Sequence, residues 1–306
     1  MPSGRWTRRL RVALACIGLA LLSAPAVAAD GQGQVKIISI GGDISQIIHG
    51  LGLTSQVVAV DTTTIYPPEL ARLPKVGYMR SLSAEGVLSL KPDLIIASEK
   101  AGPPTAITQI QNSGVRFLLL TDEPGFDGFR ERTSAIAAEL AIDARGADLI
   151  ADVQRRLNLV AREVEKTAQR PKVLFTLSVG PQGAPLAAGT HTTIDHLIRL
   201  AGGQNAITEY KEYKPLTPEA AIAAAPDIIL AMYRAVDRAG GDAAFLAQPQ
   251  LALTRAAKEE KLAKIWGSYV LGFSPRTPDA VIQLFRQFHP DAKLPADFDQ
   301  LIAARE

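Results

Sequence analysis

The chain contains the same segment twice. Residues 82–98 and residues 216–232 align without a gap, and six of the seventeen aligned columns are identical. In each copy a Ser or Thr (Ser83, Thr217) can cap a short helix, a Pro-Asp pair ends the next turn, and an aliphatic run is typical of a buried parallel strand. The repeat therefore predicts two lobes built on one plan, with a ligand in the cleft between them.

Aliphatic runs alternate with segments of helical spacing along the rest of the chain. This alternation predicts an α/β fold with central, mostly parallel sheets. The expected strands cover residues 35–40, 57–60, 94–97 and 115–120 in the first half, and a second series begins at residues 173–177.

One long amphipathic helix is predicted between the two series. Residues 144–169 contain no proline, their apolar residues recur at steps of three or four, and Pro171 ends the pattern. About 25 helical residues would span nearly 40 Å, which is the breadth of two small lobes. We therefore expect an N-terminal lobe over 35–143, a linker helix over 144–170 and a C-terminal lobe over 171–306.

The first 29 residues resemble a secretory signal peptide. Several arginines precede an apolar run at residues 12–22, which is too short to span a bilayer, and small residues follow it. We expect cleavage near Ala28-Ala29 and an exported, soluble mature chain. The single cysteine, Cys16, would be removed with the peptide, which excludes disulfides and thiolate metal sites from the mature protein.

Composition excludes several classes of function. The formal net charge is only +2, and basic residues do not cluster beyond the N-terminus, so nucleic acid is not an expected partner. Among the histidines only His191 and His196 are close in sequence, and their spacing of five does not place both on one helix face. No motif of a hydrolase or zinc protease is present, so nothing indicates catalysis.

Tyr78 is the first candidate for ligand binding. It precedes the helix of the first repeat copy, on a loop that would face the cleft, and Arg80 would share its face if the segment is extended. A guanidinium beside a phenol favours phenolate, which is a hard ligand suited to ferric iron. The alternative is an ordinary half-buried loop aromatic.

The second lobe offers a matching position. The strand at 228–232 runs directly into Tyr233 and Arg234, and Arg234 at the strand end could clamp a carboxylate across the cleft. The alternative is a solvated surface arginine.

Each repeat copy also carries a glutamate in the first turn of its helix, Glu85 and Glu219. A carboxylate there opposes the helix dipole, which contributes roughly 0.3 to 1 kcal/mol. Two exposed acids, one per lobe, could also dock on paired basic residues of a two-fold symmetric partner.

The whole mature chain resembles the periplasmic haem-binding proteins of bacterial haem ABC importers, within the class that includes the vitamin B12 and ferric-siderophore binding proteins. The string G-Y-x-R-x-L-S-x-E-G at residues 77–86 selects the haem members. Further matching segments are residues 38–42, 91–95, 200–205, 213–216 and 276–278.

The resemblance implies a periplasmic carrier, expected as a monomer, that binds one haem per chain between two α/β lobes joined by a long helix. It makes Tyr78 the ligand of the haem iron, and Arg80 and Arg234 contacts to the haem or a propionate. Tyr233, which is not typical of the family at this strand end, would shape the distal side. It also implies that Glu85 and Glu219 form salt bridges with the permease dimer of the ABC transporter.

The chain departs from some relatives at one position. Those relatives add a histidine from the second lobe as a further iron ligand, whereas this chain has Ser178-Val179-Gly180 at the corresponding place, with His191 a distant candidate. The nearest rival is a ferric-siderophore or corrinoid carrier of the same fold, and a more distant one is an exported metal- or nucleotide-dependent enzyme.

Overall fold

The computed structural model describes residues 34–177, 185–270, 272–292, 294–295 and 298. The predicted signal peptide and the segment Ser178-Val179-Gly180 lie outside these residues. The chain from Val35 onward forms one compact unit. Among the described helices, none has the length and apolar character that a membrane span requires.

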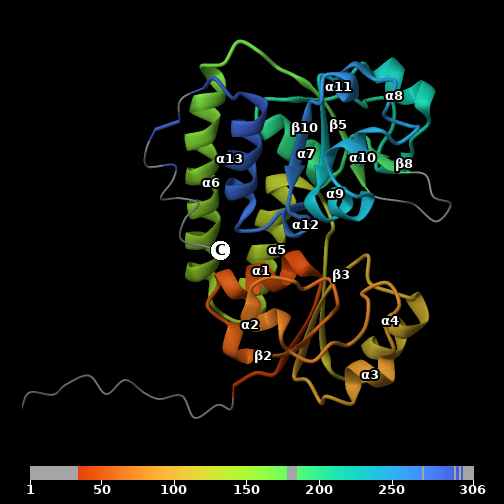
Figure 1. The fold of residues 1–306 in the computed structure, drawn as a ribbon. Helices are drawn as coiled ribbons and strands as arrows, with labels where there is room; N and C mark the ends of the chain where they lie inside the picture. Colours follow the sequence, from red (N-terminus) through yellow and green to blue (C-terminus); the bar gives the residue numbers. More distant parts are fainter. Residues whose placement is uncertain (1–33, 178–184, 271, 293, 296–297, 299–306) are drawn as a thin grey trace, which may run out of the picture. The chain divides into compact units, whose positions relative to one another are not determined.

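The first sheet is parallel, as predicted, and has the strand order β2-β1-β3-β4 (Figure 1). Its central strands β1 and β3 are aliphatic and buried along their whole length, because helices cover both faces of the sheet. The strands are β1 (Ile37–Ile40), β2 (Val57–Val60), β3 (Leu94–Ser98) and β4 (Arg116–Leu120). The helices of this lobe are α1 (Gly42–Gly50), the short 3-10 helix η1 (Thr54–Gln56), α2 (Pro68–Ala71), α3 (Ala84–Leu88) and α4 (Pro104–Gln111).

The second sheet is mixed. Its path is β10-β9-β5-β6-β8, where β9 and β10 run parallel to their neighbours, β6 pairs antiparallel with β5 and β8, and β7 pairs with β5. The strands are β5 (Lys172–Leu177), β6 (Leu186–Ala188), β7 (Gln204–Asn205), β8 (Tyr213–Pro215), β9 (Ile228–Met232) and β10 (Leu262–Ile265). The helices are α7 (Thr193–Leu200), α8 (Pro218–Ala224), α9 (Tyr233–Ala239), α10 (Asp242–Leu246), α11 (Arg255–Lys258), α12 (Gly267–Val270) and α13 (Thr277–Phe288).

The two repeat copies adopt the same local structure. Ser83 caps α3 by accepting a hydrogen bond from the amide of Gly86, and Thr217 caps α8 in the same way, at oxygen–nitrogen distances of 3.3 and 3.2 Å. Asp93 accepts from the amide of Lys36 at 2.8 Å, and Asp227 accepts from the amide of Lys172 at 2.9 Å. The Pro-Asp pair therefore fastens the repeat to the first strand of each sheet.

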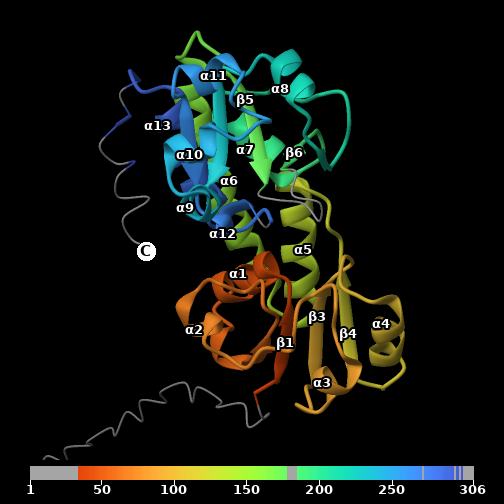
Figure 2. The ribbon, with the colours of Figure 1, turned by 45° about the vertical axis from the view of Figure 1, so that its right-hand side comes forward.

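The long helix is present but ends earlier than its pattern predicts. Helix α6 spans Asp143–Glu165, and it follows α5 (Gly125–Glu139), which packs alongside it. Arg170 folds back and donates to the carbonyl oxygens of Val164 and Thr167, at 3.0 and 2.7 Å, which closes the helix before Pro171. Apolar side chains of α6 pack on α13 and α7, beside the second sheet (Figure 2).

Helices α5 and α6 hold the segment 272–276, between α12 and α13, which we call the strap. Arg132 of α5 donates to the carbonyl oxygen of Phe273 at 3.1 Å, and Arg156 of α6 donates to that of Pro275 at 3.2 Å. Both arginine side chains are 3% exposed. One hydrophobic cluster also runs through residues of both sheets, so the lobe boundaries at 143/144 and 170/171 stay a prediction.

Candidate ligand-binding site

Tyr78 lies on a loop that continues along the edge of the first sheet. Val76 donates to the carbonyl oxygen of Val60, the last residue of β2, and Thr62 donates to that of Gly77, both at 2.9 Å. Gly77 has a φ of 102°, a conformation that glycine adopts without strain. The loop therefore leaves the sheet at the carboxyl end of its strands.

The far side of this loop is fastened as well. The carbonyl oxygen of Tyr78 accepts from Ser81, that of Met79 accepts from Gly102, and Leu82 donates back to Gly102, each at 2.8 Å. The backbone is thus held on both sides, while the Tyr78 side chain is 47% exposed. This arrangement presents a phenol at a defined place with one end free for a ligand.

Arg80 shares this turn and is exposed. Within the described residues, neither the Tyr78 hydroxyl nor the Arg80 guanidinium makes a hydrogen bond to another side chain. Both groups can therefore contact a bound molecule. The effect of Arg80 on Tyr78 stays a prediction.

The second lobe presents two aromatic rings at the matching edge. Met232 and Ile265 are partners at the ends of the parallel strands β9 and β10, and Tyr233 and Trp266 follow them directly. The two rings stack with centroids 4.5 Å apart and planes inclined by 31°. Trp266 is 53% exposed, which is unusual for so large an apolar side chain.

Neighbouring charges surround this pair. The Lys264 ammonium lies 5.7 Å from the centroid of the Tyr233 ring and 2.9 Å from the Asp242 carboxylate. Arg234, in the first turn of α9, is exposed. Sequence reasoning proposed Tyr233 and Arg234 but missed Trp266, because only the register of β9 and β10 places Trp266 beside Tyr233.

The segments that follow the carboxyl ends of the two sheets contact each other. Helix α1 starts directly after β1, and its Gln46 donates to the carbonyl oxygen of Ser268, two residues after Trp266, at 3.4 Å and accepts from the Ser274 hydroxyl at 2.8 Å. Figures 1 and 2 both show α9 and α12 at the end of the second sheet that lies nearest to α1. In α/β proteins, ligands bind beyond the carboxyl ends of parallel strands.

The buried acids at this edge serve the fold. The Asp61 carboxylate accepts from the amides of Gly41 and Thr63, each at 2.9 Å, and so ties the ends of β1 and β2 together. Burial raises the pKa of Asp43, and the guanidinium of Arg132, 3.3 Å away, opposes that rise. No group of three or more His, Cys, Asp or Glu side chains among the described residues could hold a metal ion.

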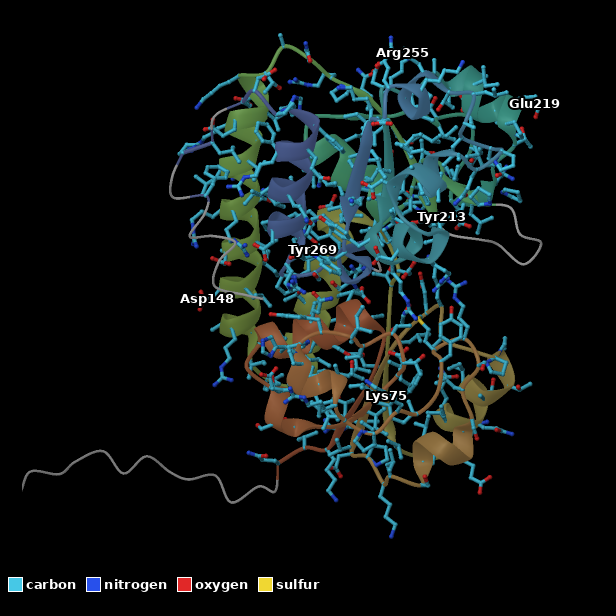
Figure 3. The ribbon with its side chains drawn as sticks, in the orientation of Figure 1. Lys75, Asp148, Tyr213, Glu219, Arg255 and Tyr269 are labelled. Carbon is cyan, nitrogen blue, oxygen red and sulfur yellow. The ribbon has the colours of Figure 1, made fainter. Side chains whose placement is uncertain are left out.

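Glu85 and Glu219 lie where the repeat predicts them. Each is exposed in the first turn of its capped helix. Figure 3 shows Glu219 at the surface of the second lobe. Both carboxylates can therefore reach a partner.

His191 and His196 line a different, polar pocket of about 480 Å³. The His191 Nε2 atom is 3.7 Å from the Glu123 carboxylate, and the His196 ring packs against Gly125. Burial lowers the pKa of His196, which favours a neutral imidazole. Apart from His191, the distant candidate for a second iron ligand, none of the residues proposed for the ligand lines this pocket.

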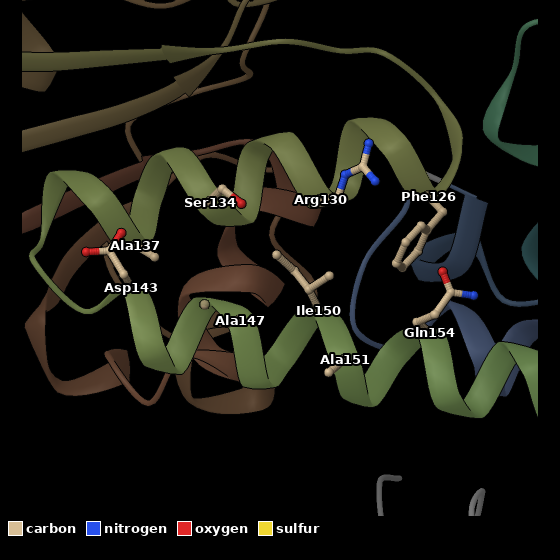
Figure 4. A pocket seen from close by; sticks show the side chains of 10 residues that line it. Phe126, Arg130, Ser134, Ala137, Asp143, Ala147, Ile150, Ala151 and Gln154 are labelled. Atoms are coloured by element: carbon tan, nitrogen blue, oxygen red, sulfur yellow. The ribbon is translucent and has the colours of Figure 1, made fainter.

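A second hollow, of about 560 Å³, lies between α5 and α6 (Figure 4). Phe126 and Ile150 line it together with Arg130 and Asp143. It too contains none of the proposed site residues.

Comparisons with solved structures place the chain among carriers. It resembles the periplasmic heme-binding protein RhuT from Roseiflexus sp. RS-1 in apo form, with 38% sequence identity, 85% of this chain and 100% of that chain covered, and a TM-score of 0.80. It resembles the periplasmic heme-binding protein BhuT in complex with two hemes to the same extent, at 38% identity, 85% and 100% coverage and a TM-score of 0.79.

Sequence comparisons agree on the class. A family model described as periplasmic binding protein matches residues 37–267. The uncharacterized ABC transporter substrate-binding lipoprotein YvrC of Bacillus subtilis is 24% identical over 262 residues, 84% of this chain and 80% of that protein. A vitamin B12-binding protein of Vibrio cholerae serotype O1 is 25% identical over 265 residues, 86% of this chain and 92% of that protein.

Proposed function

This chain belongs to the periplasmic binding protein family, and we propose that it binds haem between its lobes and delivers it to an ABC importer. The observation that carries this proposal is the exposed phenol of Tyr78 on a loop fastened at both sides, at the edge where the two sheets meet. The resemblance to two heme-binding proteins at 38% identity supports the same ligand.

Tyr78 is the proposed iron ligand. As phenolate it supplies a hard oxygen donor to ferric haem iron. Arg80, two residues along the same turn, contacts the phenol oxygen or the haem, while Arg234 reaches the ligand or a propionate from the other lobe with Tyr233 beside it. One haem binds per monomeric chain, and binding proceeds without chemical turnover.

Export and delivery complete the proposal. The periplasmic family fits removal of an N-terminal signal peptide near Ala28-Ala29. The ABC transporter relative supports a permease in the inner membrane as partner, with Glu85 and Glu219 docking on its basic residues. The lobes involved are those proposed at 35–143 and 171–306, joined by the helix at 144–170.

A corrinoid carrier is the second candidate. The vitamin B12-binding relatives favour it, although at 25% identity they are more distant than the heme-binding structures. A corrinoid brings its own lower axial base and needs no phenolate from the protein, so Tyr78 separates the two candidates. The same reasoning applies to a ferric siderophore, whose iron is already fully coordinated.

The test replaces Tyr78 with Phe, which removes only the hydroxyl. We expect loss of the charge-transfer absorption of a ferric phenolate complex and a decrease in haemin affinity of at least about tenfold, the effect of losing one strong ligand. Tyr210→Phe is the control, since the Tyr210 hydroxyl donates to a carbonyl oxygen within the second lobe. An unchanged spectrum in Tyr78→Phe would place the iron ligand elsewhere.

A further inference from the structure

Trp266 is an exposed aromatic residue at the end of a parallel strand. It follows β10 directly, its ring is 53% exposed, and Tyr233 stacks on it at 4.5 Å. Although Tyr233 stacks on it, about half of the Trp266 side chain stays exposed. Exposing aromatic surface costs free energy, and contiguous exposed apolar surface marks ligand-binding sites.

The ring pair is also held in place. The Lys264 side chain lies over the Tyr233 ring at 5.7 Å and is fixed by the Asp242 carboxylate at 2.9 Å. The carbonyl oxygen of Trp266 accepts from Tyr269 at 3.0 Å, which starts α12. The platform is therefore built from two strand ends and a helix start, and is pre-organised for a flat ligand.

Its position matches that of the proposed iron ligand. Tyr78 leaves the first sheet at the carboxyl end of its strands, and the Tyr233–Trp266 pair leaves the second sheet at the same kind of end. The hydrogen bond from Gln46 to Ser268 joins these edges two residues from Trp266. If Tyr78 coordinates the iron of a bound haem, the porphyrin ring lies on the side of the second lobe.

We propose that Trp266, supported by Tyr233, stacks on the porphyrin ring of the bound ligand and is a specificity-determining residue for planar conjugated macrocycles. This inference rests on the proposed function. It assigns separate roles to the two edges: the first lobe binds the iron, and the second lobe binds the ring. A corrin ring is puckered and carries upward-projecting amide side chains, so it would stack poorly on this platform.

The two roles predict different responses to metal-free porphyrin. Trp266→Ala should lower the affinity for haemin and for protoporphyrin IX by the same factor, about tenfold for the loss of one aromatic stack. Trp266→Phe should recover most of that loss, since it keeps an aromatic face. Tyr78→Phe should lower the affinity for haemin alone, because protoporphyrin IX has no iron for the phenolate to bind.

The control is Leu253→Ala, which removes a side chain that is 60% exposed and lies just before α11. It should change neither affinity. Circular dichroism of Trp266→Ala tests that the variant is folded, and Trp266→Phe keeps the test valid if it is not. If both Trp266 variants bind both porphyrins as the unmodified protein does, or if only haemin binding falls, the stacking role is wrong. If the unmodified protein binds no porphyrin, the proposed function fails instead.

Discussion

Single residues explain why the repeat preserves some columns and not others. Asp93 and Asp227 each fasten a repeat copy to the first strand of its sheet, and Ser83 and Thr217 each cap a helix. These two columns therefore have a structural explanation. The column of Glu85 and Glu219 has no such explanation, since both side chains are exposed. The helix dipole, which is worth less than about 1 kcal/mol here, would be served equally well by Asp.

We predict that Glu85 and Glu219 act on the partner. Replacing both with Arg should leave haemin affinity unchanged, because both side chains are exposed, and should lower the unfolding free energy by about 1 to 4 kcal/mol, because each carboxylate contributes roughly 0.3 to 1 kcal/mol and a cation there is unfavourable by a similar amount. Haem transfer to the permease reconstituted in vesicles should fall strongly, since like charges would then meet. Normal transfer by this double variant would leave only the helix-dipole role.

The candidate site was predictable only in part, for a physical reason. Tyr78 could be found because its neighbours in sequence, Arg80 and the helix of the repeat, are also its neighbours in space. Trp266 could not, since its partner Tyr233 is 33 residues away and the two meet only through the register of β9 and β10. A large aromatic directly after an aliphatic strand was the available signal.

At the scale of elements, local patterns predicted strands well and helix ends less well. The strands at Val57–Val60 and Ile228–Met232 match their aliphatic runs, because buried parallel strands need continuous apolar sequence. Helix α6 ends at Glu165 rather than near residue 169, since Arg170 binds the last carbonyl oxygens. The strap has no periodicity at all, so the sequence carried no sign of it.

A buried ion pair joins α6 to α13 next to the strap, and its contribution to stability can be measured. Arg156 of α6 and Asp279 of α13 pair with side chains 3% and 2% exposed. Arg156→Met should lower the unfolding free energy by about 3 to 5 kcal/mol, because Asp279 would keep a buried charge without its main partner. Adding Asp279→Leu should recover most of that loss. Denaturant unfolding measures both.

Arg155→Met is the matched control. Arg155 precedes Arg156 and pairs with Asp152, but its side chain is 68% exposed. Its loss should cost less than about 1 kcal/mol. Equal effects of the two substitutions, or simple addition in the Arg156/Asp279 double variant, would contradict the role given to this pair.

At the scale of the whole molecule, one hydrophobic cluster runs through residues of both sheets, and α5 and α6 both hold the strap. We therefore expect the lobes to change their relative orientation little when a ligand binds. We propose that Tyr78 supplies the iron ligand from one edge and that the Tyr233–Trp266 pair supplies a flat surface from the other, so that this site binds haem.

Titration of the chain beginning at Asp30 with haemin, and separately with cyanocobalamin, tests that claim most directly. We predict a Soret difference that rises to a break at one equivalent of haemin, and no binding of cyanocobalamin. A break at two equivalents, the number of hemes in the BhuT complex, would correct the stoichiometry alone. Binding of cyanocobalamin with no saturable binding of haemin would contradict the account.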